Sequence, residues 1–205
     1  MKALRNIILL TFAMQLSLGQ IAGQIAGELQ PVRASESPAV LVRSLYAQVV
    51  SRPPTGVTNG FDMTTFAPFL SKDLRHRIDQ TAACEADFFR QYPQTDMKPS
   101  FGWLELGLFT GDGENAGPSA FQIKRTQQQE DGAVRVTVML THAESDYRPW
   151  TWQVAAILQR EDGHFVVNDV IYLKDKNNRA DVRLSKVLSE GCNGPHWVGE
   201  SNHSQ

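Results

Sequence analysis

Cysteine is scarce in this chain: only Cys84 and Cys192 occur among its 205 residues. A structural zinc site uses cysteine and histidine at short, regular spacings, and none of the five histidines lies at such a spacing from a cysteine or a carboxylate. The glycine-rich phosphate-binding fingerprints and the Gly-x-Ser-x-Gly nucleophile elbow are also missing. We therefore expect no metal site, no cofactor and no catalytic signature of these kinds.

Long apolar segments are limited to the N-terminus. Lys2 and Arg5 precede the apolar stretch IILLTFAMQLSLG, which is too short to span a bilayer comfortably and is followed by small residues. This order is typical of a secretory signal peptide, so we predict a signal peptide over residues 1–23 and a flexible mature N-terminus over residues 24–36. An uncleaved amphipathic anchor is the alternative. The prediction is a periplasmic or secreted protein with no stable membrane span after signal cleavage.

The chain carries little net charge of either sign. It has 20 basic and 22 acidic residues, and loss of Lys2 and Arg5 with the signal peptide moves the net charge from −2 to −4. Such a surface is a poor partner for nucleic acid. In an oxidising compartment the two cysteines are expected to form one disulfide, Cys84–Cys192, with two free buried thiols as the alternative.

Two helical regions open the folded part of the chain. Ser37 is a typical N-cap, Pro38 suits the first helical turn, and apolar residues recur every four positions behind them. A second region over residues 64–92 is divided near Ser71, where a longer helix is expected to start. The apolar stripe of that helix is predicted to hold Leu74, Ile78, Phe88 and Phe89, with Glu85 in its middle and Asp87 outside it.

The second half of the chain alternates between apolar and polar residues. Residues 103–109, WLELGLF, predict a strand or an extended connection. Residues 133–173 predict a three-stranded antiparallel meander whose last turn is the Asp-Gly pair at 162–163. Residues 121–125 are its expected neighbour, and a final amphipathic helix is expected over residues 181–190, ended by a glycine.

Helices followed by strands are the order of an α+β domain, in which N-terminal helices pack on a curved antiparallel sheet. We predict one domain of this class over residues 37–192 and a C-terminal tail over residues 193–205. No internal repeat and no second domain is visible in the sequence.

Two stretches of the chain resemble a known superfamily: LVRSLYAQVV…FLSKDLRHRID in the helices and WQVAAILQREDGHFVVNDVIY in the closing hairpin. They resemble the cone-shaped α+β superfamily named after nuclear transport factor two, also called cystatin-like. More narrowly, the chain resembles exported bacterial domains of unknown function built on the same plan. The resemblance implies the cone fold over most of residues 38–190. It implies no single function, because the superfamily includes isomerases, hydratases, polyketide cyclases, transport adaptors and pure binding modules.

Glu85 and Asp169 are the candidate site carboxylates. In a regular strand Asp169 shares a face with Val167 and Ile171, and Glu85 lies in the apolar helix stripe, so both could line one interior pocket. At least one of them would then have a raised pKa and could act as a general base or acid. The alternative is that Asp169 accepts structural hydrogen bonds and that Glu85 lies at the solvent-exposed edge of the apolar stripe.

Trp103 and Glu105 are further pocket candidates. The tryptophan ring would pack against a ligand, and the glutamate carboxylate would bind its polar group. Ordinary sheet packing of the tryptophan is the alternative.

Three functional hypotheses follow. The preferred one is an exported, non-catalytic domain that binds a small apolar molecule or an envelope protein through the mouth of the cone. The second is an enzyme of the isomerase, cyclase or dehydratase kind, with Asp169 and Glu85 as acid and base. The third is an inhibitor or immunity-type protein. Open sheet faces also favour a homodimer.

Overall fold

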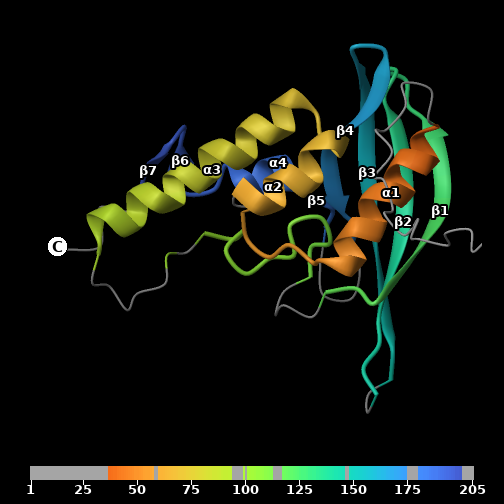
Figure 1. Cartoon of the computed structure of the whole chain (residues 1–205), viewed down its shortest axis with the longest axis horizontal. Coiled ribbons are helices and arrows are strands. Elements are labelled where there is room, and N and C mark those ends of the chain that lie inside the picture. The colour runs from red at the N-terminus through yellow and green to blue at the C-terminus, as the bar shows by residue number, and fades with distance from the viewer. Residues whose placement is uncertain are drawn as a thin grey trace, which may run out of the picture. The chain divides into compact units, whose positions relative to one another are not determined.

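The computed structural model describes residues 37–57, 60–93, 99, 101–112, 117–145, 148–174 and 180–199 (Figure 1). The predicted signal peptide and the predicted mature N-terminus lie outside these residues. Helices and strands follow one another along the chain as α1 (Pro38–Ser51), α2 (Gly60–Phe66), the 3-10 helix η1 (Ala67–Phe69), α3 (Lys72–Gln91), β1 (Ala120–Gln128), β2 (Val134–His142), β3 (Trp150–Glu161), β4 (His164–Tyr172), β5 (Val182–Arg183), α4 (Leu184–Leu188), β6 (Cys192–Asn193) and β7 (His196–Trp197).

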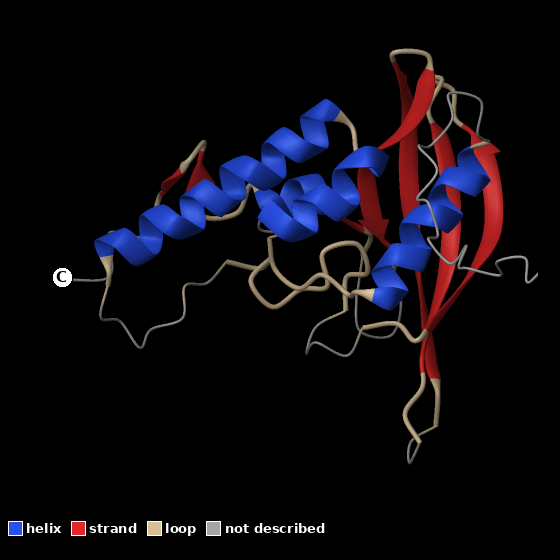
Figure 2. Cartoon of the chain, viewed as in Figure 1, coloured by secondary structure: helices blue, strands red, loops and turns tan. Residues whose placement is uncertain are grey.

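The main sheet is antiparallel and has the strand order β1-β2-β3-β4-β5, so each strand lies beside its neighbour in the sequence. Helix α1 packs against β1 and β2, and its buried side chains join those of β2, β3 and β4 in one core (Figure 2). The α+β prediction and the predicted meander are both confirmed, and β1 is the expected neighbour of β2. No helix in the described part of the chain is long and apolar enough to cross a membrane.

The two predicted helix starts are confirmed. The Ser37 hydroxyl accepts a hydrogen bond from the Val40 backbone N–H, and Pro38 occupies the first turn of α1. The Ser71 hydroxyl accepts from the Leu74 backbone N–H at 3.0 Å and begins α3. Each cap satisfies an N–H group that has no partner within its own helix.

The predicted stripe of α3 is right for three of its residues and wrong for two others. Leu74, Ile78 and Phe88 are buried, as expected. Phe89 was expected on the buried stripe but is 45% exposed, and Asp87 was expected outside it but is only 3% exposed. The reason is a second packing partner, because the C-terminal hairpin covers the side of α3 that carries Asp87.

A β-bulge at Asn168 changes which way the end of β4 faces. Val167 pairs with Leu158, whereas Asp169 pairs with Ile157, so Asn168 is an extra residue in the strand. Each step of one residue reverses the side-chain direction in a strand, so the extra residue puts Asp169 on the opposite face from Val167. The prediction that Asp169 and Val167 share a face is therefore wrong.

The Asp-Gly hairpin turn is confirmed. Asp162 and Gly163, which connect β3 to β4, have φ angles of 50° and 83°. Two consecutive residues with positive φ are what a tight two-residue hairpin turn requires.

Residues 103–109 form a connection without regular strand pairing. The segment consists of turns and bends with one isolated β-bridge at Gly107, so the prediction of a strand there is wrong. Three aromatic side chains donate hydrogen bonds to three consecutive backbone carbonyl groups at the end of this connection. The donor–acceptor distance is 2.8 Å in each of them. The Tyr172 hydroxyl donates to Leu108, the Tyr46 hydroxyl to Phe109 and the Trp152 indole N–H to Thr110.

The C-terminal region departs from the predicted helix over residues 181–190. Residues 182–183 extend the main sheet as β5, and α4 covers only Leu184–Leu188. Gly191 then adopts φ 71°, and a Cβ atom there would lie 2.6 Å from the Phe101 ring, so this position requires glycine. The predicted domain end at residue 192 falls inside β6, and the β6–β7 hairpin packs on α3.

Candidate functional site

Trp103 and Glu105 do not line one pocket together. The Trp103 side chain is fully buried and stacks on Phe101 with ring centroids 4.6 Å apart. Its indole Nε1 atom has no hydrogen-bond partner in the described structure. Glu105 is exposed. The tryptophan is therefore a core side chain, and the glutamate lies at the surface.

Asp169 is buried, and its carboxylate accepts hydrogen bonds that have a structural role. Its Oδ1 atom accepts from the backbone N–H groups of Val170 and Ser185, at 2.9 and 3.1 Å. Its Oδ2 atom accepts from the Ser185 hydroxyl at 2.8 Å and from Arg183 Nη1 at 3.0 Å. Ser185 lies in the first turn of α4, so Asp169 caps this helix from the neighbouring strand.

Asn168, the bulge residue, makes the equivalent connection to α3. The Ser71 hydroxyl donates to Asn168 Oδ1 at 2.8 Å, and the Ser71 backbone N–H donates to the Val167 carbonyl at 2.8 Å. The bulge thus anchors the first turns of both α3 and α4. This arrangement explains a carboxylate within an otherwise apolar strand.

Glu85 is half-buried on α3, and burial raises the pKa of its carboxyl group. It makes no hydrogen bond or ion pair with the residues that the structure describes. The contacts of Asp169 are all to Val170, Arg183 and Ser185, so the structure does not bring the two predicted carboxylates together.

The core is filled by large aromatic side chains. Tyr46, Phe66, Trp103 and Phe109 are all fully buried in one cluster with the apolar residues of the sheet.

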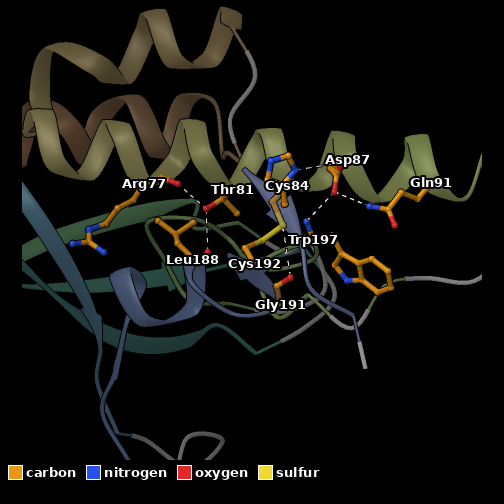
Figure 3. The surroundings of a disulfide bond; sticks show 10 residues. Arg77, Thr81, Cys84, Asp87, Gln91, Leu188, Gly191, Cys192 and Trp197 are labelled. Atoms are coloured by element: carbon orange, nitrogen blue, oxygen red, sulfur yellow. Dashed lines mark hydrogen bonds and ion pairs between the residues drawn. A yellow bond between two sulfur atoms is a disulfide. The ribbon is translucent and has the colours of Figure 1, made fainter. Parts of the chain in front are cut away.

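A polar cluster that the sequence did not reveal lies around Asp87 (Figure 3). Its Oδ2 atom accepts from the Trp197 backbone N–H at 3.0 Å and from Gln91 Nε2 at 2.8 Å. Arg90 forms an ion pair with Oδ1, and His196 Nδ1 lies 3.8 Å from the same oxygen. The Trp197 N–H, followed by the Arg90 charge, the Gln91 amide and His196, holds the pKa of Asp87 below its usual value.

The predicted disulfide is confirmed one helical turn from Asp87. It joins Cys84 on α3 to Cys192 on β6, with a distance of 6.0 Å between the two Cα atoms. Figure 3 shows Cys84 and Asp87 projecting from α3 toward Cys192 and Trp197. The disulfide and the Asp87 hydrogen bond therefore attach the same hairpin to the same helix at two points.

Aromatic side chains surround this attachment. The Trp197 ring lies 5.0 Å from that of Phe88 and 5.4 Å from that of Tyr92, and the Phe89 ring lies 5.3 Å from that of Phe88. Phe89 and Tyr92 are 45% and 38% exposed. We call the surface formed by Phe89, Tyr92 and Trp197 the aromatic face.

A small pocket opens beside the disulfide, between α3, α4 and the hairpin. Its volume is about 80 Å³. We call it the disulfide pocket, and its lining includes Arg77, Thr81, Ser185, Leu188, Ser189 and Cys192. The three hydroxyl groups each donate to an internal oxygen: Thr81 to the carbonyls of Arg77 and Leu188, Ser189 to the carbonyl of Lys186, and Ser185 to Asp169.

The described residues contain no group of three or more histidine, cysteine, aspartate or glutamate side chains arranged to hold a metal ion. Comparison with protein-family models, with curated proteins and with solved structures finds no match for this chain. The resemblance to the superfamily named after nuclear transport factor two, and the cone shape that it implies, stay predictions.

Proposed function

We propose that this protein is an exported, non-catalytic domain that binds another protein, and that the aromatic face is its docking surface. The observation that carries the proposal is the gathering of exposed apolar side chains there. Five large hydrophobic residues are exposed in the described part of the chain, and two of them, Phe89 and Tyr92, both pack on Phe88 in this one surface. Clustered exposed apolar groups commonly mark interaction sites, whereas scattered ones need no explanation.

The aromatic face is held rigidly, which favours binding. Trp197 is fixed through its backbone N–H to Asp87 and through the disulfide five residues earlier. Tyrosine and tryptophan dominate interface hot spots, and side chains that are already ordered lose less entropy when a partner binds.

The charges at the edge of this face indicate the chemistry of the partner. The side chains of Arg90 and His196 are 70% and 71% exposed, whereas that of Asp87 is only 5% exposed. A partner therefore meets the Arg90 guanidinium at the edge of an apolar surface. We infer that it presents an apolar side chain next to a carboxylate.

Export is supported by the disulfide together with the predicted signal peptide. A disulfide-bonded pair is compatible with an oxidising location outside the cytoplasm. A partner in the envelope or outside the cell fits this location. An inhibitor or immunity-type protein would use the same kind of surface, and the identity of its partner would distinguish it.

The binding of a small apolar molecule and the enzyme hypothesis receive less support. Large aromatic side chains are part of the buried core in which an apolar ligand would have to bind, so such a ligand would compete with them for space. Both oxygens of Asp169 are bound to the first turn of α4 and to its neighbours, so the carboxylate proposed as acid or base already has a structural role.

Selection from a random peptide library displayed on phage tests the proposal with a defined probe. The immobilised protein should enrich peptides that carry an aromatic or aliphatic residue beside an acid. Their binding should be lost in Phe89→Ala and weakened in Arg90→Glu. Val40→Ala is the matched control, because Val40 is 43% exposed on α1 and lies outside the aromatic face. Enrichment of no peptide, or binding that Phe89→Ala leaves unchanged, would refute the proposed function.

A further inference from the structure

The β6–β7 hairpin is attached to the domain differently from the other strands. Its two strands pair only with each other and form a sheet separate from the main one. A two-stranded hairpin is at best marginally stable by itself in water. Its position therefore depends on its attachments to α3, which are the disulfide, the Asp87 hydrogen bond and the packing of Trp197 on Phe88.

One of the two cysteines in the disulfide can be approached from solvent. Cys84 is fully buried, whereas Cys192 is half-buried and lines the disulfide pocket. The pocket volume of about 80 Å³ is several times the roughly 10 to 15 Å³ that a cavity needs on this measure to hold one water, so the tip of a thiol side chain fits. Arg77 also lines the pocket, and its Nε atom donates to Asp73 Oδ2 at 2.7 Å.

We propose that the Cys84–Cys192 disulfide is a reversible redox site, opened through the disulfide pocket by a protein dithiol of the thiol–disulfide oxidoreductase class, and that its reduction releases the β6–β7 hairpin from α3. The redox step stands on the pocket and the disulfide alone. Its consequence for partner binding rests on the proposed function of the aromatic face.

The reaction is a pair of thiol–disulfide exchanges. A thiolate of the reductant attacks Cys192 Sγ, a mixed disulfide forms, and Cys84 leaves as a thiolate that takes up a proton. The second thiol of the reductant then attacks the mixed disulfide and releases Cys192 as a thiol. The protein disulfide is reduced to two thiols, and the dithiol is oxidised to its own disulfide.

Release of the hairpin would dismantle the aromatic face. Trp197 would leave α3, and its backbone N–H would no longer satisfy Asp87. Phe88, now 4% exposed beneath Trp197, would become accessible to solvent. Partner binding through this face therefore belongs to the oxidised form, and a reductant switches it off.

Reduction of the full mature chain by dithiothreitol without denaturant is the first test, followed by mass spectrometry of labelled thiols and by hydrogen exchange. Both cysteines should become labelled, and faster exchange should be limited to residues 191–199 and the part of α3 facing them. A disulfide that resists reduction until denaturant is added overturns the proposal. Faster exchange throughout the main sheet also overturns it, because the whole domain would then have opened.

A pair of variants on α4 tests the route of attack. Ser189 is exposed and lines the disulfide pocket, so Ser189→Tyr should plug it and slow native reduction by about tenfold or more, because exchange depends on access to the attacked sulfur. Lys186 is exposed on the same helix outside the lining, and Lys186→Tyr should leave the rate unchanged. Both variants should be reduced equally fast in denaturant. Equal native rates for the two variants would exclude attack through this pocket.

A phage-selected peptide separates this inference from the proposed function. If reduction occurs natively but no peptide binds the oxidised form, the docking function fails and the redox site stands. If a peptide binds equally well to the reduced and oxidised forms, the redox control of the face is wrong.

Discussion

Asp87 on α3 accepts a hydrogen bond from the backbone N–H of Trp197 at 3.0 Å, across a separation of 110 residues. The contact joins the long helix to the last hairpin that the structure describes. Arg90 and Gln91, one turn further along α3, bind the same carboxylate. A buried acid therefore connects the helix to the hairpin and fixes the tryptophan of the aromatic face.

Replacement of Asp87 by asparagine should destabilise the protein in a pH-dependent way. The pKa of Asp87 is lowered in the folded state, so its charge stabilises the fold above the ordinary aspartate pKa. This contribution is lost as the pH falls through the lower folded pKa.

The melting temperature of Asp87→Asn should lie well below that of the wild type at pH 7, and the gap should close below about pH 4, near the ordinary pKa of aspartate. Asp79→Asn, at an exposed position on the same helix, is the control. A gap that stays constant with pH would contradict this role.

Glu85→Gln should have the opposite effect. Burial raises the pKa of Glu85 in the folded state, so its ionised form opposes folding at neutral pH. The variant should melt at a slightly higher temperature than the wild type at pH 7, and the gain should disappear below about pH 4, where glutamate is protonated in both states. Thermal unfolding at several pH values measures this, with Glu130→Gln as an exposed control. Destabilisation at neutral pH would show that Glu85 has a partner that its charge requires.

Asp169→Ala should destabilise the fold strongly. The substitution removes four hydrogen bonds, two of them from the first turn of α4, and leaves buried donors without partners. We expect a loss of about 3 kcal/mol in the free energy of unfolding, because several hydrogen bonds to one buried carboxylate are lost together. Urea denaturation measures the loss. Asp131→Ala is the matched control, because Asp131 also accepts from a backbone N–H but in an exposed turn. Equal losses in the two variants would show that Asp169 does not anchor α4.

The sequence predicts those parts of the fold in which the signal is local. Ser37 and Ser71 identify their helix starts because an N-cap side chain bonds to its own first turn. The Asp162-Gly163 turn is equally local. Cys84 and Cys192 are predicted as a pair because they are the only two cysteines in the chain.

The bulge at Asn168 does not follow from the sequence pattern of a regularly alternating strand. The sequence does contain a sign of it, since adjacent apolar pairs, Val166-Val167 and Val170-Ile171, flank Asn168 and Asp169. Such pairs interrupt a period of two. A change of face between them would have placed Asp169 away from Val167 and indicated its structural role.

A single apolar stripe does not predict the burial of Asp87, because such a stripe describes one packing partner of the helix. The disulfide prediction itself implied a second one. Cys84 and Asp87 are three residues apart and thus neighbours on the helix surface, so a chain segment joined to Cys84 also passes near Asp87. The distances that bring Trp197 to this carboxylate arise from the hairpin turn after Cys192, and the sequence pattern alone does not give them.

Tyr46→Phe should weaken the connection between the core and residues 108–110. The Tyr46 hydroxyl is fully buried and donates to the Phe109 carbonyl at 2.8 Å, so its removal leaves that carbonyl without its partner. We expect a loss of about 1 to 2 kcal/mol in the free energy of unfolding. Tyr92→Phe is the control in urea denaturation, because the Tyr92 side chain is 38% exposed and its hydroxyl makes no hydrogen bond with the described residues. A loss in the control as large as that in Tyr46→Phe would contradict the assignment.

The indole N–H signals in a nitrogen-15 NMR titration test the docking surface most directly. The chain has four tryptophans, of which Trp197 belongs to the aromatic face, Trp103 is buried, and Trp150 and Trp152 lie on β3. Titration of the oxidised protein with a phage-selected peptide should shift the Trp197 signal and leave the other three in place. If the Trp150 signal shifts instead, or if all four stay fixed while the peptide binds, the aromatic face is not the docking surface.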